Sequence, residues 1–179
     1  MDKLVHVDTG WTLFLDRDGV INERVFGGYI LTFEDFYFKK GVRENAQKLF
    51  SKFERIIVVT NQQCVGKGLI SSDELTLLHQ EMVKEFQKVG ARIDKVYSAI
   101  ELKDEKPHMR KPHSKMAELA KLDFPEIDFN KSIMVGDTDT DILFGKKLGM
   151  KTVLIRSEEK ITIKPDLALS KLDDLIAFI

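Results

Sequence analysis

The sequence predicts an α/β fold built on a doubly wound, Rossmann-like parallel sheet, and three observations support this fold class. Short apolar runs alternate along the chain with amphipathic segments, an order typical of parallel strands connected by helices. The first run, residues 12–15, carries no charge, as expected of a strand covered on both faces. The 179 residues contain no internal repeat and no linker rich in Pro, Gly or Ser, so we expect a single domain, residues 1–179.

The expected strands follow the apolar runs in chain order. They are residues 12–16, 55–60, 93–98, 132–136 and 151–155, with a short sixth strand at 167–169. Helices are expected between and after them, at residues 42–53, 72–89, 114–122, 139–148 and 171–178.

The helices are predicted from their apolar faces and their ends. Ser71 and Glu74 have the spacing of a capping box, which predicts a helix start. Gly149 ends the helix that begins at residue 139. In the helix at 42–53, apolar residues recur at spacings of three and four and make one face: Val42, Ala46, Leu49 and Phe50.

Two aspartates, Asp16 and Asp18, stand two residues apart where the first predicted strand ends. The carboxyl ends of strands are where open α/β sheets bind ligands. Two carboxylates at that edge repel each other unless a cation or a shared proton relieves them. Taken alone, an Asp-x-Asp-Gly segment is also compatible with an ordinary acidic turn.

Further polar groups occur at the ends of later strands and in a loop. Thr60 and Asn61 follow the second predicted strand, and Asp137 follows the fourth. Arg110 and Lys111 precede a predicted helix. Because a doubly wound sheet gathers its strand ends at one edge, we expect these groups to lie together.

As an ordered set, these residues resemble the haloacid dehalogenase (HAD) superfamily of phosphatases. The segment DRDGV matches the first motif of that superfamily, Thr60 the second, Lys111 the third and GDTDTD the fourth. The resemblance extends over residues 12–155. The segments DRDGVIN, GGYI, TNQ and RKP resemble one branch in particular, which contains the D-glycero-D-manno-heptose 1,7-bisphosphate phosphatases and the histidinol-phosphate phosphatases.

The resemblance implies a role for each motif residue. Asp16 is expected to attack phosphorus and form an aspartyl phosphate; the alternative is that it only binds metal. Asp18 is expected to be the general acid and base, or else a turn aspartate bonded to its own backbone. The Thr60 hydroxyl, the backbone N–H of Asn61 and Lys111 are expected to bind the phosphoryl oxygens.

The implied cofactor is Mg2+, and oxygen ligands suit this ion. The expected ligands are Asp16, the backbone carbonyl of Asp18, and Asp137. Asp141 is expected to hold a metal-bound water or to orient Lys111.

Four nearby residues are assigned other roles from the sequence. Arg110 is either a bidentate phosphate ligand or a surface arginine, and Lys67 is a candidate for a distal substrate phosphate. The segment around Lys67 lacks the spacing of a nucleoside-triphosphate loop. Cys64 is expected to be a bystander, because no histidine stands near it in sequence. Asp139 is expected to be a solvated residue at a helix N-terminus.

The chain departs from its nearest resemblance just before the RKP segment. Relatives in that branch commonly carry a zinc-binding loop of Cys and His there. This chain has Ala99, Ile100 and a charged stretch, with only His108 and His113 and no cysteine. A structural zinc site needs about four N or S ligands, so we expect no zinc. The missing loop also leaves substrate specificity open.

Two segments, residues 22–38 and 101–113, fit no regular element. Long loops in a compact domain are often functional, and the sequence does not indicate whether these close over a substrate. Neither is long enough for a large cap domain, so we expect a HAD-like domain with a minimal cap or none.

Composition limits the classes of partner. Lys and Arg total 28 against 29 Asp and Glu, which gives no support for bulk binding to nucleic acid or to an anionic membrane. No apolar run approaches the roughly 18 residues needed to span a bilayer, the N-terminus lacks a signal-like apolar region, and a single cysteine excludes an internal disulfide. We therefore expect a cytoplasmic protein whose partner is a small phosphorylated molecule; the oligomeric state is not indicated.

The favoured function is a Mg2+-dependent phosphomonoesterase acting on a small sugar phosphate, with the 7-phosphate of heptose 1,7-bisphosphate as the best candidate. Histidinol phosphate, another small metabolite and a nucleic-acid end stay open as substrates. A different class, the phospho-acceptor signalling module, also uses acids, a Thr and a Lys on a doubly wound sheet. Its phosphorylated Asp follows a later strand, and the lifetime of the aspartyl phosphate would separate the two classes.

Overall fold

The computed structural model describes residues 3–179, and its centre is one sheet of six parallel strands in the order β3-β2-β1-β4-β5-β6. The strands are β1 (Thr12–Leu15), β2 (Arg55–Asn61), β3 (Lys95–Ala99), β4 (Ser132–Gly136), β5 (Lys151–Ile155) and β6 (Leu167–Leu169). This confirms the predicted doubly wound α/β fold and the existence of all six strands.

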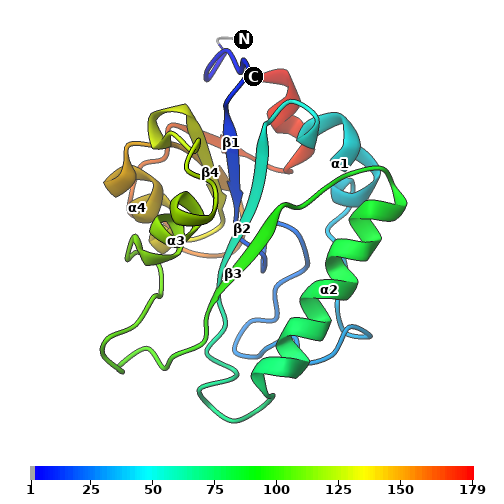
Figure 1. Ribbon diagram of the computed structural model, residues 1–179, viewed down its shortest axis with the longest axis vertical. Coiled ribbons are helices and arrows are strands. Elements are labelled where there is room, and N and C mark those ends of the chain that lie inside the picture. Colours follow the sequence, from blue (N-terminus) through cyan, green and yellow to red (C-terminus); the bar gives the residue numbers. More distant parts are fainter. Residues whose placement is uncertain (1–2) are drawn as a thin grey trace.

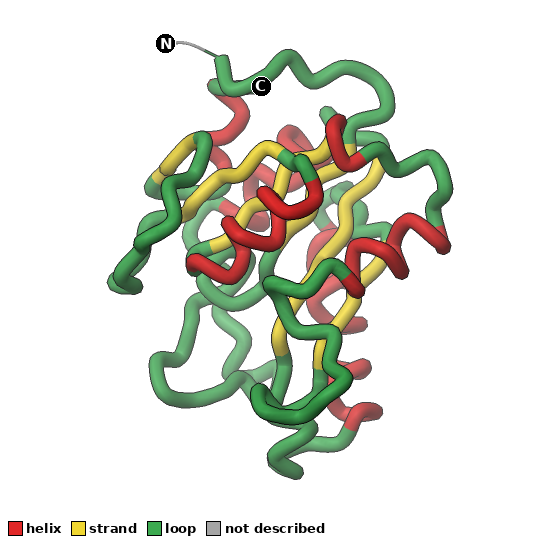
Figure 2. Tube along the Cα trace, turned by 90° about the vertical axis from the view of Figure 1, so that its left-hand side faces the viewer, coloured by secondary structure: helices red, strands yellow, loops and turns green. Residues whose placement is uncertain are grey.

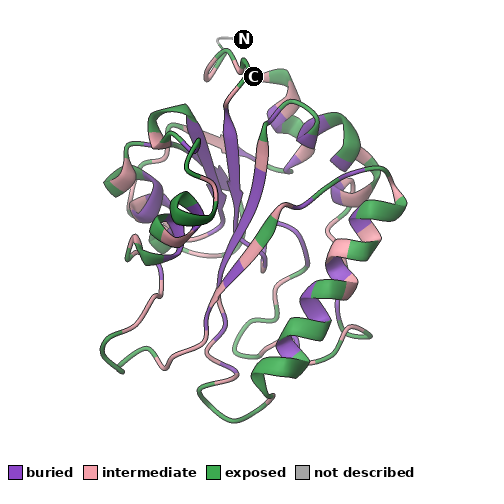
Figure 3. Cartoon of the chain, viewed as in Figure 1, coloured by how far each residue is buried: buried purple, intermediate pink, exposed green. Residues whose placement is uncertain are grey.

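Helices cover both faces of the sheet (Figure 1). They are α1 (Val42–Phe50), α2 (Ser72–Lys88), α3 (Lys115–Asp123) and α4 (Asp139–Leu148), with 3-10 turns at Phe129–Lys131 and Asp173–Ala177. The two faces hold separate apolar cores. Leu13 and Leu15 of β1 pack into the core beneath α1 and α2, while Phe14 points into the core beneath α3 and α4. Burial on both faces explains why the central strands β1, β2 and β4 are largely apolar (Figure 3).

Several element ends differ from the sequence prediction, and local hydrogen bonds explain them. The strand predicted from residue 93 begins at Lys95, because the Asp94 carboxylate accepts the Ile56 N–H at 2.7 Å and so precedes the ladder. The helix predicted to residue 53 ends at Phe50, because the chain then turns back to donate from Glu54 to the Trp11 carbonyl at 2.8 Å. The predicted helix at 171–178 is a short 3-10 turn instead.

The carboxyl ends of the strands meet at one end of the molecule. The C-terminus lies at the opposite end in Figure 1, and Figure 2 shows the irregular loops gathered beyond the strand ends. The segments at 22–38 and 101–113 are among these loops. Within the described residues, no helix is long and apolar enough to cross a membrane.

Candidate active site

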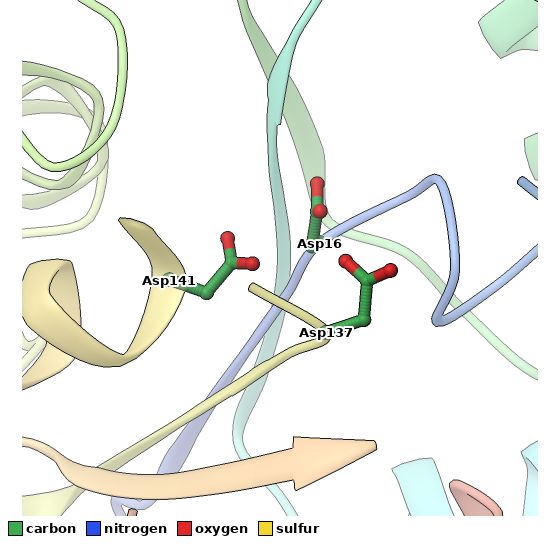
Figure 4. A group of neighbouring side chains, drawn as sticks. All are labelled: Asp16, Asp137 and Asp141. Atoms are coloured by element: carbon green, nitrogen blue, oxygen red, sulfur yellow. The ribbon is translucent and has the colours of Figure 1, made fainter. Parts of the chain in front are cut away.

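Three carboxylates converge at the carboxyl ends of β1 and β4. Asp16 directly follows β1, Asp137 directly follows β4, and Asp141 lies in the first turn of α4. Each offers an oxygen, and these oxygens lie within 4.8 Å of one another. Figure 4 shows the side chains of Asp16 and Asp137 standing side by side, with Asp141 pointing toward them from the helix. Such a cluster can hold a metal ion.

Two glycines permit this close approach. Gly19 has a φ of +89°, and a Cβ on it would collide with the Asp137 carboxylate. A Cβ on Gly136 would collide with the side chain of Asp141. Any larger residue at either position would therefore displace a carboxylate of the cluster.

Lys111 joins two of the three carboxylates. Its Nζ lies 2.8 Å from Oδ1 of Asp16 and 2.6 Å from Oδ1 of Asp141, and the lysine is buried. Burial alone would lower the pKa of Lys111, but the charges of Asp141 and Asp16 outweigh it and leave the pKa raised. The ammonium form is therefore held between the two acids. Asp141 is itself oriented by Thr138, whose hydroxyl and N–H donate to Oδ2 at 2.6 and 3.1 Å.

The cluster holds more negative charge than Lys111 offsets. Burial, together with Asp141 and Asp137, raises the pKa of Asp16 to about 8 against the opposing effect of Lys111. Burial and Asp141 raise the pKa of Asp137 to about 6. Oδ1 of Asp137 is buried and accepts no hydrogen bond from residues 3–179. An unpaired buried carboxylate oxygen is costly, so the chemistry of this donor set fits a divalent cation.

Arg24 is a second cation at the cluster that the sequence did not indicate. It comes from the loop after β1, and its Nη1 donates to Oδ2 of Asp137 at 3.2 Å. Its Nη2 lies 3.1 Å from Oε1 of Glu159. Arg24 therefore contacts both Asp137 and Glu159, and so connects the loop after β1 to the segment after β5.

Asp18 has a different environment from Asp16. Arg17 donates to it from Nε at 3.1 Å and from Nη2 at 2.9 and 3.0 Å, Asn22 Nδ2 donates at 2.9 Å, and Gln62 Nε2 donates at 2.7 Å. Burial alone would raise the pKa of Asp18, but the charge of Arg17 and these hydrogen bonds outweigh it and lower the pKa. Asp18 is thus held as a carboxylate by donors from the loop after β1 and from the residue that follows β2.

Thr60 and Asn61, the last two residues of β2, connect the Asp18 side to Lys111. The buried Thr60 hydroxyl accepts a hydrogen bond from Gln62 Nε2 at 2.8 Å. The Asn61 side chain bonds the backbone of Lys111 twice, through Oδ1 from the N–H at 2.9 Å and through Nδ2 to the carbonyl at 3.3 Å. Asn61 therefore ties the loop that carries Lys111 to the sheet, a role beyond the phosphate contact predicted for its backbone.

A cleft of about 720 Å³ gathers most of these residues. Its lining includes seven of the eight predicted site residues: Asp16, Asp18, Thr60, Asn61, Lys67, Arg110 and Lys111. The eighth, Asp137, is buried beside Asp16. Both long loops border the cleft, the first through Arg24 and Tyr29 and the second through Lys103 and His108.

Arg110 and Lys67 lie at the part of the cleft lined by Tyr29. Nη1 of Arg110 is buried and has no hydrogen-bond partner in the described part of the chain. Nζ of Lys67 lies 5.1 Å from the centre of the Tyr29 ring, and the Tyr29 hydroxyl accepts a hydrogen bond from Gln63 at 2.8 Å. Arg110 thus has a free donor in the cleft, which is what a second anionic group of a ligand requires.

Two other residues considered from sequence, Cys64 and Asp139, make structural contacts. Cys64 is buried with its Sγ 3.7 Å from two oxygens of Gln62, and burial raises its pKa, which disfavours the thiolate. Asp139 begins α4 and stays partly exposed, as predicted, and its carboxylate also accepts hydrogen bonds from Thr162 and from Ile163. It fastens the segment after β5 to the helix.

His108 and His113 face each other with ring centres 4.6 Å apart. A tetrahedral zinc site needs about two more ligands of N or S type. The expected absence of zinc stays a prediction, which elemental analysis of the purified protein can check.

Comparison with known proteins agrees with the geometry. A family model described as HAD-hydrolase-like matches residues 108–175. The chain is 34% identical over 177 residues to a D-glycero-alpha-D-manno-heptose-1,7-bisphosphate 7-phosphatase of Burkholderia mallei, covering 93% of this chain and 92% of the relative. It is 34% identical over 148 residues to the protein of the same name from Campylobacter jejuni, covering 83% of each.

Solved structures share the fold. The heptose 1,7-bisphosphate phosphatase of B. bronchiseptica, complexed with magnesium and phosphate, matches with a TM-score of 0.74 at 21% identity, over 80% of this chain and 79% of that one. The corresponding protein of Burkholderia thailandensis matches with a TM-score of 0.64 at 22% identity, over 93% of this chain and 96% of that one.

Proposed function

The chain belongs to the haloacid dehalogenase superfamily of hydrolases, and we propose that it is a Mg2+-dependent phosphatase that removes the 7-phosphate of a heptose 1,7-bisphosphate. One observation carries the proposal. The Asp16 carboxylate borders the cleft, belongs to an acid cluster that can hold a metal ion, and lies 2.8 Å from the buried Lys111. A nucleophile, a cation site and a phosphate-binding charge are therefore adjacent.

The first step is attack of an Asp16 oxygen on phosphorus. The new bond joins that oxygen to phosphorus, the bond from phosphorus to the sugar oxygen breaks, and an aspartyl phosphate forms. Lys111 holds Asp16 in place at 2.8 Å and offers its charge to the phosphoryl oxygens. The Thr60 hydroxyl and the Asn61 N–H donate to the same oxygens, which is most of what phosphoryl transfer requires of a protein.

Asp18 serves both halves of the reaction. It gives a proton to the departing sugar oxygen and later takes one from the water that hydrolyses the aspartyl phosphate. Its lowered pKa suits the second half directly. The first half needs a protonated Asp18, and the charge of the incoming phosphate favours that form, because a nearby negative charge raises the pKa of a carboxyl group.

The residues that would hold Mg2+ are Asp16, Asp137 and the backbone carbonyl of Asp18. When bound, the ion supplies positive charge that offsets the repulsion between the anionic nucleophile and the anionic phosphate. The buried oxygen of Asp137 that accepts no hydrogen bond from residues 3–179 supports this assignment. So does the magnesium and phosphate complex of the B. bronchiseptica relative.

The substrate proposal rests on the relatives' activity and on Arg110. A heptose bisphosphate carries a second phosphate about one sugar away from the first, and the unpartnered Nη1 of Arg110 is a donor for it. Lys67, held near Tyr29 in the same cleft, can add a second positive charge. Binding energy from this remote phosphate raises kcat/KM when it is realised in the transition state.

The test is phosphate release with Mg2+ from a heptose 1,7-bisphosphate, its 7-monophosphate, histidinol phosphate and nucleotides. We expect the bisphosphate to have the highest kcat/KM, with the 7-phosphate cleaved. Arg110→Ala should narrow the preference for bisphosphate over monophosphate by about tenfold, the effect of losing roughly 1.4 kcal/mol. Lys103→Ala, which removes an exposed cation of the same cleft, should leave the preference unchanged. A higher kcat/KM for histidinol phosphate or a nucleotide would refute the substrate and leave the phosphatase chemistry standing.

A further inference from the structure

A fully buried arginine lies between the two aspartates in sequence and grips the second of them. Arg17 is 0% exposed. One edge of its guanidinium, Nε and Nη2, forks onto the Asp18 carboxylate with bonds of 2.9–3.1 Å. Its face lies over the ring of Phe36, with 5.8 Å from the guanidinium carbon to the ring centre. The remaining nitrogen, Nη1, points to a residue of another element.

That residue is His79 of α2, whose Nε2 lies 3.1 Å from Nη1 of Arg17. An arginine N–H can only donate, so Nε2 must be the acceptor and the ring proton must sit on Nδ1. Burial, and after it the charge of Arg17, lowers the pKa of His79 to about 3. The imidazole is therefore neutral at physiological pH, as this hydrogen bond requires.

The bond to His79 fixes the guanidinium at its third corner. With Nε and Nη2 on Asp18 and Nη1 on His79, the plane of the guanidinium is defined, and so is the plane of the carboxylate that it grips. Removal of the acceptor would leave a buried N–H unsatisfied and let the guanidinium rotate, since an unpaired buried donor costs more than the bond is worth. The carboxylate of Asp18 would turn with it.

We propose that His79 is a positioning residue that acts through Arg17 to aim the Asp18 carboxylate at the leaving-group oxygen. The inference rests on the acid and base role proposed for Asp18. Proton transfer requires the two heavy atoms to approach within about 3 Å, and misplacement of a reacting group by about 1 Å can cost two orders of magnitude in rate. The residue lies on α2 among side chains that belong to the core, such as Leu78 and Met82, and it is part of neither the sequence motifs nor the lining of the cleft.

The surroundings of His79 decide which substitution is informative. Besides contacting Arg17, His79 borders a cavity of about 550 Å³ between α2 and β3. A small replacement would let water enter and accept the Arg17 bond, so His79→Leu is the informative change. His79→Gln keeps an acceptor and is the conservative variant. Met82→Ala truncates a fully buried core residue about one turn further along α2 and is the matched control for loss of packing.

The readout is the ratio of kcat/KM for an alkyl phosphate to kcat/KM for an aryl phosphate, because kcat/KM reports on the steps up to release of the alcohol and an aryl leaving group needs little protonation there. We expect His79→Leu to lower this ratio by about tenfold, since the lost contact acts on protonation of the leaving group, which the alkyl phosphate needs and the aryl phosphate does not. His79→Gln should restore most of the ratio. Met82→Ala should lower the melting temperature and leave the ratio at its wild-type value.

A wild-type ratio in folded His79→Leu would overturn the proposal, whatever its total activity. If His79→Leu does not fold, Arg17→Lys tests the same contact. A lysine cannot fork onto both oxygens of Asp18 while bonding His79, so the ratio should fall, and an unchanged ratio would refute the proposal. Asp18→Asn separates this from the proposed function. An unchanged ratio in Asp18→Asn would mean that Asp18 is not the acid, whereas a low ratio there beside a normal one in His79→Leu would refute only the role of His79.

Discussion

Asp16 and Asp18 are the same residue type, two positions apart in the chain, yet their surroundings shift their pKa values in opposite directions. Asp16 lies among the carboxylates of Asp137 and Asp141 with Lys111 as a counter-charge, and its pKa is raised to about 8. Asp18 lies among the donors of Arg17, Asn22 and Gln62, and its pKa is lowered. Burial acts in the same direction on both, so the neighbours decide the difference.

The two sides of the site therefore differ in whether their negative charge is already balanced. The Asp16 side is short of positive charge, and a bound cation would offset both this deficit and the repulsion between the proposed nucleophile and an anionic phosphate. The Asp18 side already holds its full set of donors. This difference supports the proposed division, in which the metal binds beside Asp16 and Asp18 transfers the protons.

The largest expected effect is that of Asp16→Asn. The amide keeps the shape of the carboxylate but cannot act as the nucleophile, so kcat should fall by at least about 1,000-fold, roughly 4 kcal/mol in the barrier. Steady-state phosphate release measures this, with thermal unfolding as the control for an intact fold. More than about a tenth of the wild-type kcat would rule out covalent catalysis by Asp16.

Asp18→Asn should give a smaller effect of a different kind. Loss of the acid and base should lower kcat for an alkyl phosphate by about 100-fold. With an aryl phosphate, attack should still proceed and the aspartyl phosphate should accumulate, because no base activates water. Rapid-quench kinetics should then show a burst of aryl alcohol of about one per active site. Equal losses on both substrates without a burst would argue that the two sides of the site are not divided in this way.

The sequence was sufficient to predict the fold and to predict which candidate site residues lie together. Apolar runs covered on both faces predict strands, and the capping box at Ser71 and Glu74 is present as expected, with Glu74 N–H bonded to the Ser71 hydroxyl at 3.1 Å. The motif residues fall in one cleft because parallel strands end at a common edge. The order of the motifs along the chain is therefore enough to predict that these residues lie together.

The contacts that distinguish Asp16 from Asp18 could not be predicted in the same way. Gln62 and His79 lie 44 and 62 residues from the partners they bond at the Asp18 side, and their roles exist only once β2 and α2 are packed beside β1. Arg17 was visible as a charged residue at a strand end, but its burial and its fork onto Asp18 depend on that packing. Arg24 reaches Asp137 across 113 residues for the same reason.

Mg2+ should stabilise the protein in a pH-dependent way that reports on the Asp16 side. The folded pKa values of Asp16 and Asp137, about 8 and about 6, lie above the ordinary 3.8. The metal-free fold therefore binds more protons than the unfolded chain, and its stability falls as pH rises from about 4 through 8. Mg2+ binds the charged forms and removes this loss, so the gain in melting temperature on adding Mg2+ should be about 5 °C larger at pH 8 than at pH 5.

Scanning calorimetry with Mg2+ and with a chelator measures the gain at both values of pH. Asp137→Asn is the matched control, because it removes one of the two raised groups and should flatten the pH dependence of the gain. An equal or larger gain at pH 5 would mean that Mg2+ does not bind through these two carboxylates. The activity should also depend on Mg2+: it should stop when a chelator removes the ion and return when Mg2+ is added.

The smallest expected effect is that of Cys64→Ala, which tests whether the donors around Asp18 depend on a residue that packs behind Gln62. Cys64 is buried next to Gln62, with Sγ 3.7 Å from the side-chain and backbone oxygens of that residue. Cys64→Ala removes one buried atom and should cost about 1 kcal/mol of folding free energy. Gln62 keeps its stronger bonds to Asp18 and Thr60, at 2.7 and 2.8 Å, so kcat on alkyl and aryl phosphates should stay within about twofold of wild type. A selective fall on alkyl phosphates alone would show that the thiol helps to hold Gln62 on Asp18, and that the Asp18 side extends one residue deeper than its direct donors.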